Sequence, residues 1–330
     1  MGPKVSVIIP AFNQEEFIGD AVYSALSQTY SNLEIVVSDD GSSDNTPNII
    51  NEIAARYPDK IIAICHRMNG GIASNLNRAL ARCSGELVAW LGGDDLMLPQ
   101  KIEKQVTVLN KNPDAAGCCH DAEVFNSEDS CVLGRFSQIY NGSNELRIGG
   151  VELLFDPCYF MLPSTMMIRR KYIPQHGFDE RLRYSNDWLF DVEVFRHGIC
   201  IPINEVLCRY RRHASNITTS QEAQQNGAED GLVALTIAEA RYPELARMIK
   251  RRRAIYLISL ASKNMSLGDT GRSWQYTLGA VGQGAMAQAL VAFAFSSLFR
   301  IFVRNQQHAP AYTRSALFTN LARLLKRSIR

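Results

Sequence analysis

The feature that most constrains the fold is an alternation of short apolar runs and amphipathic segments between Val5 and about His120. The apolar runs have the length and composition of buried strands, and they occupy residues 5–9, 33–37, 61–65, 87–91 and 115–119. The segments between them have helical periodicity: 15–28, 45–56, 71–82 and 99–110. Strands that alternate with helices form a mostly parallel sheet covered on both faces. The alternation therefore predicts an α/β fold with a Rossmann-like first half.

Polar turns follow the first four strands, at residues 10–13, 38–42, 69–71 and 92–95. Because ligands bind beyond the carboxyl ends of parallel strands, we expect these turns to line one rim. The acidic pairs Asp39–Asp40 and Asp94–Asp95 should then be neighbours. Adjacent carboxylates repel each other, and a divalent ion such as Mg²⁺ or Mn²⁺, with phosphate as a further ligand, would balance them. The alternative for the second pair is a solvated helix cap before the helix that begins near Pro99.

Two common nucleotide-binding motifs are missing from the sequence. No G-x-G-x-x-G follows the first strand, and there is no P-loop. Residues 39–44 are consistent with a plain Asx turn and helix cap, but a carboxylate here can also accept the imide N–H of uracil or thymine. Cytosine lacks that donor at this position, so the pair favours a uracil or thymine nucleotide if it binds a base.

Taken together, these motifs resemble the family 2 glycosyltransferases of the GT-A fold. The resemblance covers about residues 4–218 and rests on an ordered combination of segments: 5–13, 25–30, 34–46, 69–71 and 85–95. It implies an inverting enzyme that transfers a sugar from a nucleotide diphosphate donor, usually with Mn²⁺ or Mg²⁺. Each segment alone would be a weak signal.

The resemblance also implies roles for individual residues. The nucleoside would be held by Pro10, Ala11, Asn13, Glu15, Asp40 and Asn69, with Asp40 on the base. Asp94 would contact the ribose and diphosphate, and the metal ligands would be Asp94, Asp95 and His213. His213 belongs to a segment, 210–216, that resembles the motif closing the family's catalytic domain, and Arg212 beside it would neutralise the diphosphate. A histidine in a basic turn is equally often a surface residue.

The general base implied by the resemblance is Asp187, in the sequence YSNDW at the start of an expected helix over residues 186–196. Asp187 would take the proton from the acceptor hydroxyl. Its alternative role is a plain helix cap. Asp191 and Glu193, further along the helix, are weaker candidates.

Two positions depart from the family's pattern. Gly92 stands where another Asp is common, which puts the metal ligation in doubt, and Leu76 stands where an Arg is common, which puts one donor contact in doubt. The Q-x-x-R-W motif of processive members is missing, so we expect a single transfer per encounter.

The predicted domains are a catalytic domain over residues 1–220, with a donor half to about 120 and an acceptor half over 121–220, and a helical region over 221–330. In the acceptor half, strands are expected at 164–168 and 206–210. The stretch between Arg272 and Arg300 has no formal charge, and it fits a buried helix, an in-plane interfacial helix or a transmembrane helix. Basic residues at 300, 304 and 323–330 would suit an anionic membrane surface.

The sequence as a whole therefore indicates a metal-dependent inverting glycosyltransferase. It would use a UDP- or dTDP-sugar to extend a polysaccharide or another glycoconjugate, with a saccharide or lipid-linked glycan as acceptor. A net charge of +2 gives no preference for nucleic acid, and the lack of a signal-peptide pattern favours a cytoplasmic or membrane-peripheral protein. The alternative is a catalytically silent nucleotide-sugar-binding scaffold, which the residues Gly92 and Asn186 make conceivable.

Overall fold

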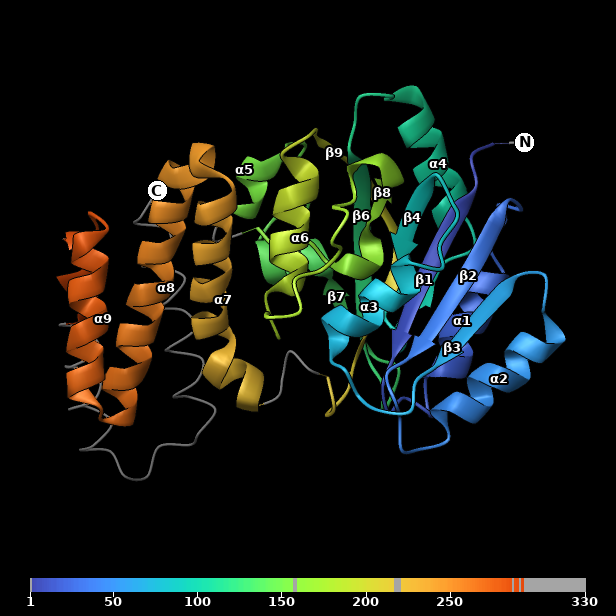
Figure 1. Ribbon diagram of the computed structural model, residues 1–330, viewed down its shortest axis with the longest axis horizontal. Helices are drawn as coiled ribbons and strands as arrows, with labels where there is room; N and C mark the ends of the chain where they lie inside the picture. Colours follow the sequence, from blue (N-terminus) through green and yellow to red (C-terminus); the bar gives the residue numbers. More distant parts are fainter. Residues whose placement is uncertain (1, 157–158, 217–220, 287, 291, 294–330) are drawn as a thin grey trace. The chain divides into compact units, whose positions relative to one another are not determined.

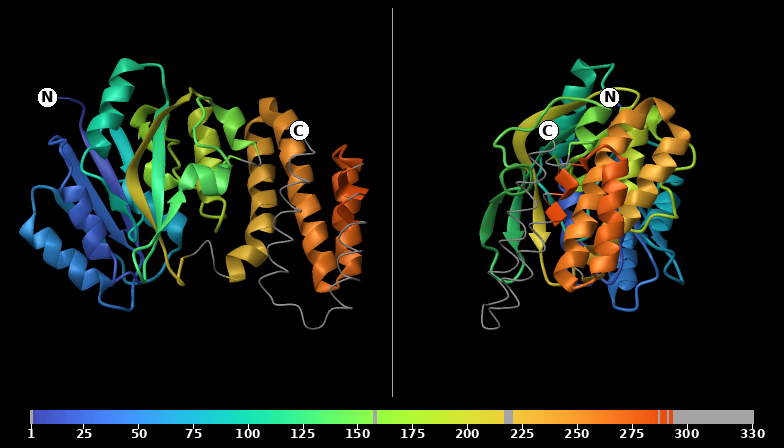
Figure 2. Two further views of the ribbon diagram at one scale, coloured as in Figure 1. Left: turned by 180° about the vertical axis from the view of Figure 1, so that it is seen from behind. Right: turned by 90° about the vertical axis from the view of Figure 1, so that its left-hand side faces the viewer.

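The computed structural model describes residues 2–156, 159–216, 221–286, 288–290 and 292–293. The chain divides into two compact units (Figures 1 and 2). The first comprises Met1–Leu154 and Tyr159–Thr219, and the second comprises Phe155–Cys158 and Ser220–Arg330. We call them the catalytic unit and the helical unit.

The first half of the catalytic unit is a parallel sheet, as the alternation predicts. Strands β1 (Val5–Ala11), β2 (Leu33–Asp39), β3 (Ile61–Cys65) and β4 (Leu87–Trp90) lie in the order β3-β2-β1-β4. The crossover helices are α1 (Ile18–Leu26), α2 (Thr46–Arg56) and α3 (Ile72–Leu80). Because crossovers are right-handed, the reversal of direction after β3 puts α3 on the face opposite α1 and α2, and Figure 1 shows α3 crossing in front of the sheet.

The second half of the sheet is mixed. β8 (Met167–Arg169) runs antiparallel to β4 and to β6 (Gly117–Asn126), while β9 (Cys200–Arg212) runs parallel to β6. The short strands β5 (Leu96–Met97) and β7 (Val132–Arg135) pair with β9 and β6. The remaining helices include α4 (Lys101–Lys111), α5 (Val151–Leu154) and α6 (Asn186–Phe195). The predicted strand at 164–168 begins with a 3₁₀ turn over Pro163–Thr165, so only its end is extended.

Apolar side chains fill both faces of the central strands, but one buried polar cluster interrupts them. Glu34 on β2 is 7% exposed, and its carboxylate accepts hydrogen bonds from Ser6 Oγ at 2.6 Å and Ser84 Oγ at 2.8 Å. Lys4 Nζ lies 2.6 Å from the same carboxylate. These partners satisfy a charge that would otherwise be expensive to bury.

The described part of the helical unit contains α7 (Gln221–Arg241), α8 (Ala246–Leu267) and α9 (Thr270–Gly282), with α8 packed against the other two. Small residues of α8, α9 and the following turn form its core: Ala254, Ile258, Ala280, Ala285, Ala289 and Ala292. In the described part of the stretch between Arg272 and Arg300, some side chains thus pack against α8, while Trp274, Leu278, Met286 and Leu290 are exposed. Arg300, Arg304 and residues 323–330 lie outside the described residues. Within the described chain we find no helix whose length and apolarity would let it cross a membrane.

Candidate active site

The turns after β1 and β2 are joined by reciprocal hydrogen bonds. Asn13 Oδ1 accepts from the backbone N–H of Ser43 at 2.9 Å, and Glu15 Oε2 accepts from that of Asn45 at 2.7 Å. In return, Ser42 Oγ accepts from the N–H of Asn13 at 2.8 Å. Asn13 has a φ of +51°, a conformation that Asn tolerates better than most residues. The two predicted nucleoside-binding side chains therefore also fix the neighbouring turn.

Asp40 links the β2 turn to the turn after β3. It is 3% exposed, and its two carboxylate oxygens accept from the backbone N–H groups of Gly70 at 2.9 Å and Gly71 at 2.8 Å. Asn69 Oδ1 also accepts from Gly71, at 3.1 Å. Arg78, in the last turn of α3, has its Nη1 3.8 Å from Asp40. This places an arginine beside the predicted base-binding carboxylate, two positions after Leu76, which is buried.

Asp94 is held by the segment that follows β9. Its Oδ2 lies 3.0 Å from His213 Nε2, and Asn216 Nδ2 donates to it at 3.2 Å. Arg211 Nε donates to the backbone carbonyl of Asp94 at 2.8 Å. The side chains of Asp94 and His213 keep 17% and 10% of their surface exposed. The structure thus brings together two residues that the sequence predicts as metal ligands.

Asp95 points inward, away from this pair. It is 2% exposed, with Oδ2 accepting from Ser164 Oγ at 2.6 Å and Oδ1 from the N–H of Arg211 at 3.0 Å. Burial and the charge of Asp94 hold the pKa of Asp95 well above its usual range. Both oxygens of Asp95 are already used by protein donors, so its first effect is to fix the turn.

A buried lysine, Lys101, also stabilises the turn that carries Asp94 and Asp95. Lys101 is fully buried, and its Nζ donates to the carbonyl oxygens of Trp90 at 3.0 Å and Ser164 at 2.9 Å. Burial lowers the pKa of this amine to about 8. Trp90 is the last residue of β4, so Lys101 ties the strand end to the 3₁₀ turn that carries Ser164.

Steric crowding explains why glycine occupies positions 92 and 93. A Cβ at Gly92 would lie 2.7 Å from Asp94 Oδ1, and a Cβ at Gly93 would lie 2.2 Å from Gln14 Oε1 and 2.8 Å from the carbonyl oxygen of Pro10. An Asp at position 92, common in the resembling family, would therefore require this turn to shift. The sheet order also shows how the acidic turns are arranged. Because β1 lies between β2 and β4, the pairs Asp39–Asp40 and Asp94–Asp95 flank the β1 turn instead of touching each other, and Gly93 approaches Pro10 closely.

Asp187 lies in the first turn of α6, where it was predicted. Its Oδ1 accepts from the N–H of Trp188 at 2.7 Å. Phe190, one turn on, packs edge-to-face against Trp90 with ring centroids 5.9 Å apart. This contact sets α6 beside β4, the strand that leads into the turn carrying Asp94. Asp191 is buried on the same helix, and burial together with the charge of Asp187 holds its pKa well above the usual value.

The two arginines at the end of β9 face different partners. Side chains alternate along a strand, so Arg211 faces the Asp94–Asp95 turn while Arg212 stacks on Tyr210 and donates to its hydroxyl at 3.2 Å. Arg211 is 9% exposed and also lies 3.4 Å from Asp20. The predicted diphosphate contact, Arg212, is therefore not the arginine that braces the acidic pair.

The donor set fits a divalent ion only if substrate completes it. A carboxylate and an imidazole, Asp94 and His213, are ligands that Mn²⁺ accepts, and such ions take their remaining positions from phosphate and water. Across the described ranges, no group of three or more His, Cys, Asp or Glu side chains is arranged to hold a metal by itself. Such a donor set would suit a site that is completed by a ligand, and not a closed protein cage.

Comparison with known proteins points to one family. The family model described as glycosyl transferase family 2 matches residues 6–177. An uncharacterized glycosyltransferase of Rickettsia prowazekii is 34% identical over 233 residues, covering 69% of this chain and 70% of the relative. One from Haemophilus influenzae is 30% identical over 265 residues, covering 78% and 75%.

Solved structures of low sequence identity share the fold. S. aureus TarS 1-349 in complex with UDP-GlcNAc superposes with a TM-score of 0.66 at 15% identity, covering 92% of each chain. The mannosyltransferase PcManGT from Pyrobaculum calidifontis, in complex with GDP-Man and Mn²⁺, gives 0.59 at 18% identity, covering 99% of this chain and 87% of that one. The mixed sheet with its flanking helices is thus the GT-A arrangement.

Proposed function

Because this chain belongs to glycosyltransferase family 2, we propose that it is an inverting enzyme that moves a single sugar from a UDP- or dTDP-sugar to an acceptor hydroxyl. The observation that carries the proposal is the rim of strand-end turns, in which a fixed carboxylate, Asp40, and a fixed carboxylate–imidazole pair, Asp94 and His213, lie on either side of the β1 turn. The family establishes glycosyl transfer. The donor, the stereochemistry and the residue roles are the parts proposed here.

The nucleoside would bind over the β1, β2 and β3 turns. Asp40 would accept the imide N–H of the base, since each of its oxygens has a second lone pair beyond those used by Gly70 and Gly71. Arg78, 3.8 Å away, would place a positive charge beside this carboxylate. The other proposed contacts come from the same turns: Pro10, Ala11, Asn13, Glu15 and Asn69.

The diphosphate would bind beside Asp94. We propose Asp94 and His213 as the residues that contact Mn²⁺ or Mg²⁺, and Asp95 as the buried acid that fixes their turn, because both its oxygens are engaged by Ser164 and Arg211. The ion's chemistry would be to stabilise negative charge on the leaving diphosphate. Arg212, next to His213 and partly exposed, would add a positive charge to the same phosphates.

Asp187 would act as the general base. Its place at the start of α6 makes it the carboxylate offered to an acceptor, and the N–H of Trp188 fixes its orientation. It would remove the hydroxyl proton as the oxygen attacks the anomeric carbon from the face opposite the leaving group, which inverts that centre.

For the acceptor we propose a saccharide or lipid-linked glycan in polysaccharide or glycoconjugate biosynthesis, bound over residues 121–220. We place the enzyme in the cytoplasm, peripheral on the inner face of the cell membrane. The support for membrane contact is the composition of α8, which has six Lys or Arg residues and no Asp or Glu.

The donor proposal is tested by nucleotide binding. UDP, dTDP, GDP and CMP are each added to the full chain with Mn²⁺ or with EDTA, and the melting temperature is measured, because a ligand of the folded state raises it. We expect stabilisation by UDP or dTDP that requires Mn²⁺. Stabilisation by GDP alone would refute the UDP or dTDP donor, and equal shifts in EDTA would refute the metal role of Asp94 and His213.

The catalytic proposal is tested by Asp187→Asn, with Asp269→Asn as the matched control. Asp269 caps α9 by accepting from the N–H of Arg272 at 2.9 Å, so its replacement by Asn reports the loss of a carboxylate charge at a helix start without a catalytic role. The readout is UDP release from UDP-sugars with water as acceptor. We expect Asp187→Asn to lower the rate roughly 10²–10⁴-fold with unchanged UDP affinity. A rate equal to that of the control would contradict the assignment.

A further inference from the structure

The first turns of α8 carry an unusual concentration of positive charge. Within the helix ARMIKRRRAIYLISLASKNMSL, five of the six basic residues fall in the first eight positions, Ala246–Arg253. The amino end of a helix is the positive end of its dipole, so cations are disfavoured there. Helix formation therefore does not explain this cluster, and a bound anion would compensate it.

Only part of that charge is balanced by the protein. Arg253 pairs with Glu239 at 2.8 Å. Arg252 is 8% exposed, stacks on Tyr256, and has no hydrogen-bond partner for Nε and Nη1 among the described residues. Arg247 and Lys250 are exposed, and neither side chain makes an ion pair or hydrogen bond within the part of the chain that the structure describes. Two cations are thus available for a ligand.

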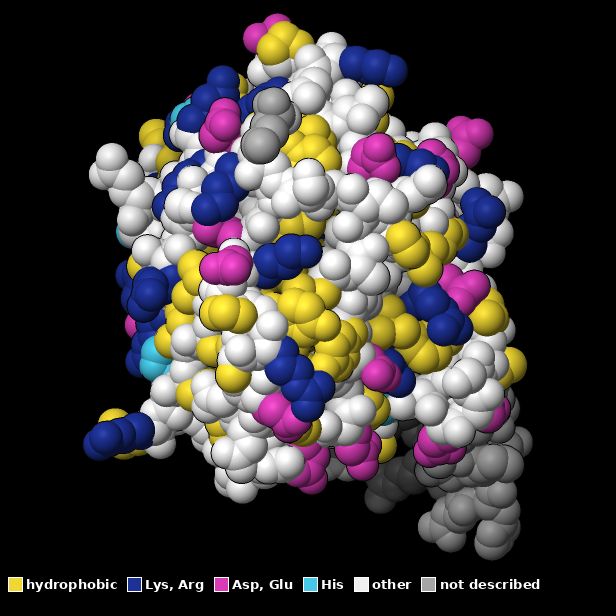
Figure 3. Space-filling view, turned by 90° about the vertical axis from the view of Figure 1, so that its right-hand side faces the viewer, with side chains coloured by type: hydrophobic (Ala, Val, Ile, Leu, Met, Phe, Trp, Pro, Cys, Tyr) yellow, Lys and Arg dark blue, Asp and Glu magenta, His cyan; other side chains and the backbone are white. Residues whose placement is uncertain are grey.

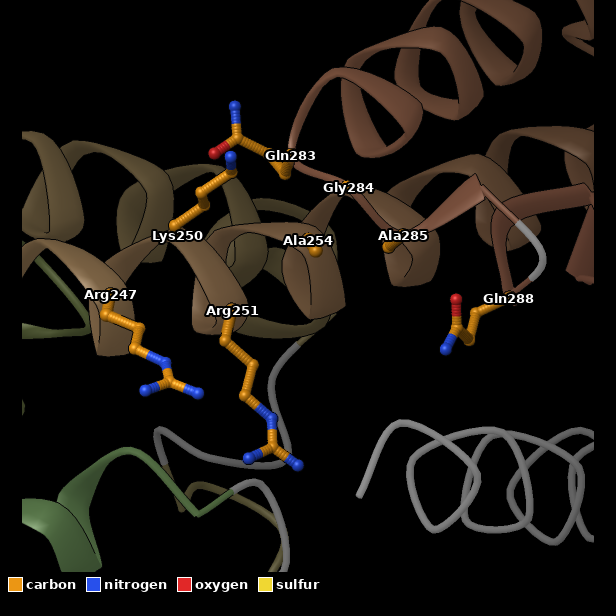
Figure 4. Close-up of a pocket in the computed structure, with 8 residues that line it drawn as sticks. All are labelled: Arg247, Lys250, Arg251, Ala254, Gln283, Gly284, Ala285 and Gln288. Atoms are coloured by element: carbon orange, nitrogen blue, oxygen red, sulfur yellow. The ribbon is translucent and has the colours of Figure 1, made fainter.

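A pocket of about 260 Å³ lies against these side chains (Figure 4). One face of α8 supplies Arg247, Lys250, Arg251 and Ala254, at helical spacing, and the turn after α9 supplies Gln283, Gly284, Ala285 and Gln288. Figure 4 shows Arg247, Arg251 and Gln288 extending to one side and Lys250 with Gln283 to the other. Among the described residues that line the pocket there is no carboxylate. Its polar lining consists of guanidinium, ammonium and carboxamide groups, which donate hydrogen bonds to oxyanions.

The backbone at the turn adds to this chemistry. Gly284 has a φ of +85°, which allows the chain to reverse between α9 and the next helical turn. The lining of the pocket accordingly includes Gln283 on one side of this turn and Gln288 on the other. Guanidinium groups match the geometry of phosphate oxygens better than they match a spherical anion.

We propose that this pocket of the helical unit binds a phosphate group, either on a soluble phosphoryl compound or on a lipid headgroup. It contains none of the residues of the candidate active site, so it is a second anion site with its own ligand. The inference is independent of the donor nucleotide and of the role of Asp187. On the face shown in Figure 3, by contrast, acidic and basic side chains are interspersed.

The test compares two double variants of the full chain. Arg247→Gln with Lys250→Gln removes the two cations that have no partner in the described structure, so no intramolecular ion pair is lost. Lys60→Gln with Arg82→Gln removes two exposed cations of the catalytic unit that likewise show no ion pair, and it changes the net charge equally. A difference between the variants therefore reports the place of the charge and not its amount.

The soluble arm uses inorganic phosphate, with nitrate at equal ionic strength as the control for screening. EDTA is included in every sample, because the diphosphate end of the active site is proposed to need Mn²⁺ or Mg²⁺ to hold phosphate. We expect phosphate to raise the melting temperature of the wild type and of Lys60→Gln/Arg82→Gln more than nitrate does. That difference should vanish in Arg247→Gln/Lys250→Gln.

The lipid arm measures sedimentation with vesicles of phosphatidylcholine, with and without phosphatidylglycerol. If the phosphate belongs to a lipid, the wild type binds only the phosphatidylglycerol vesicles, and the α8 variant loses roughly fivefold in affinity per cation removed while the control keeps its affinity. Phosphate stabilisation without vesicle binding would assign a soluble ligand. The proposal is overturned if the wild type responds in neither arm, or if both variants lose binding equally.

Discussion

The most direct test of the geometry at the acidic turn is Ser164→Ala. The hydroxyl of Ser164 donates to Asp95 Oδ2 at 2.6 Å and accepts from the N–H of Gly92 at 2.9 Å. Ser164 is 4% exposed, so water cannot readily replace it. The substitution leaves two buried polar groups without this partner, and at about 1–3 kcal/mol for each we expect the free energy of unfolding to fall by roughly 2–5 kcal/mol.

Ser24→Ala is the matched control. Its Oγ also makes two hydrogen bonds, to the carbonyl of Ala21 at 2.7 Å and from the N–H of Met97 at 3.0 Å. Only the N–H of Met97 lacks an acceptor after substitution, because the carbonyl of Ala21 lies inside α1. We therefore expect a loss of about 1–2 kcal/mol.

Urea unfolding followed by tryptophan fluorescence measures both losses, and Mn²⁺-dependent UDP binding measures their effect on the site. Ser164→Ala should weaken UDP binding in the presence of Mn²⁺ because the turn that carries Asp94 is released, whereas Ser24→Ala should not. If Ser164→Ala is no more destabilising than the control and binds UDP equally well, the network around Asp95 does not position Asp94.

Three further predictions concern stability. Burial raises the pKa of Glu34, but hydrogen bonds from Lys4, Ser6 and Ser84 outweigh this effect and lower the pKa from 4.5 to about 2. The stabilisation that the ionised Glu34 gives the native state is therefore complete above pH 4.5 and is lost as the pH falls toward 2. A profile of melting temperature against pH for Glu34→Gln should lack this loss. Asp191 has a raised pKa, so it destabilises the native state increasingly as the pH rises above 3.8. Asp191→Asn should therefore have a higher melting temperature than the wild type at neutral pH, and the difference should close near pH 3.8. A lower melting temperature for Asp191→Asn at neutral pH would refute this prediction. Gly41 has a φ of +75°, and a Cβ on it would lie 2.6 Å from the Met68 carbonyl carbon, so Gly41→Ala should lower the free energy of unfolding by more than about 2 kcal/mol. Gly227 in α7 has open space around it, so Gly227→Ala should raise the free energy of unfolding by up to about 1 kcal/mol in the same urea titration.

The fold was largely predictable because buried parallel strands leave continuous apolar runs. The runs at 5–9, 33–37 and 61–65 correspond to β1, β2 and β3 within two residues at each end. β5 and β7 could not be found in this way: β5 has two residues, and the side chains of β7 are largely exposed. Their positions depend on pairing with β9 and β6, which is tertiary information.

The site was less predictable because its geometry depends on side-chain direction. The sequence singles out Arg212, but strand alternation puts Arg211 on the Asp94 side, and the phase of β9 is not readable from 206–210 alone. Ser164 gave no signal, because a serine in a 3₁₀ turn is ordinary. Lys101 did leave a signal in the sequence, because it is a lysine two positions after Pro99, at the start of an expected amphipathic helix. In the structure this lysine is fully buried. Asn216 could have been predicted, since it lies only three residues after His213. The interpretation of this segment gave it no role.

The partners that hold Asp94 come very late in the chain. His213 and Asn216 are 119 and 122 residues downstream of it, and Arg211 is 117 residues downstream of the carbonyl that it holds. During synthesis, the turns of β1, β2 and β3 can therefore form their mutual bonds long before the Asp94 turn has any of these partners. A ribosome-bound chain that ends before β9 would have a nucleoside-facing rim without its diphosphate end. With the donor site proposed above, competence to bind a complete donor would be acquired only after β9 has left the ribosome and joined the sheet.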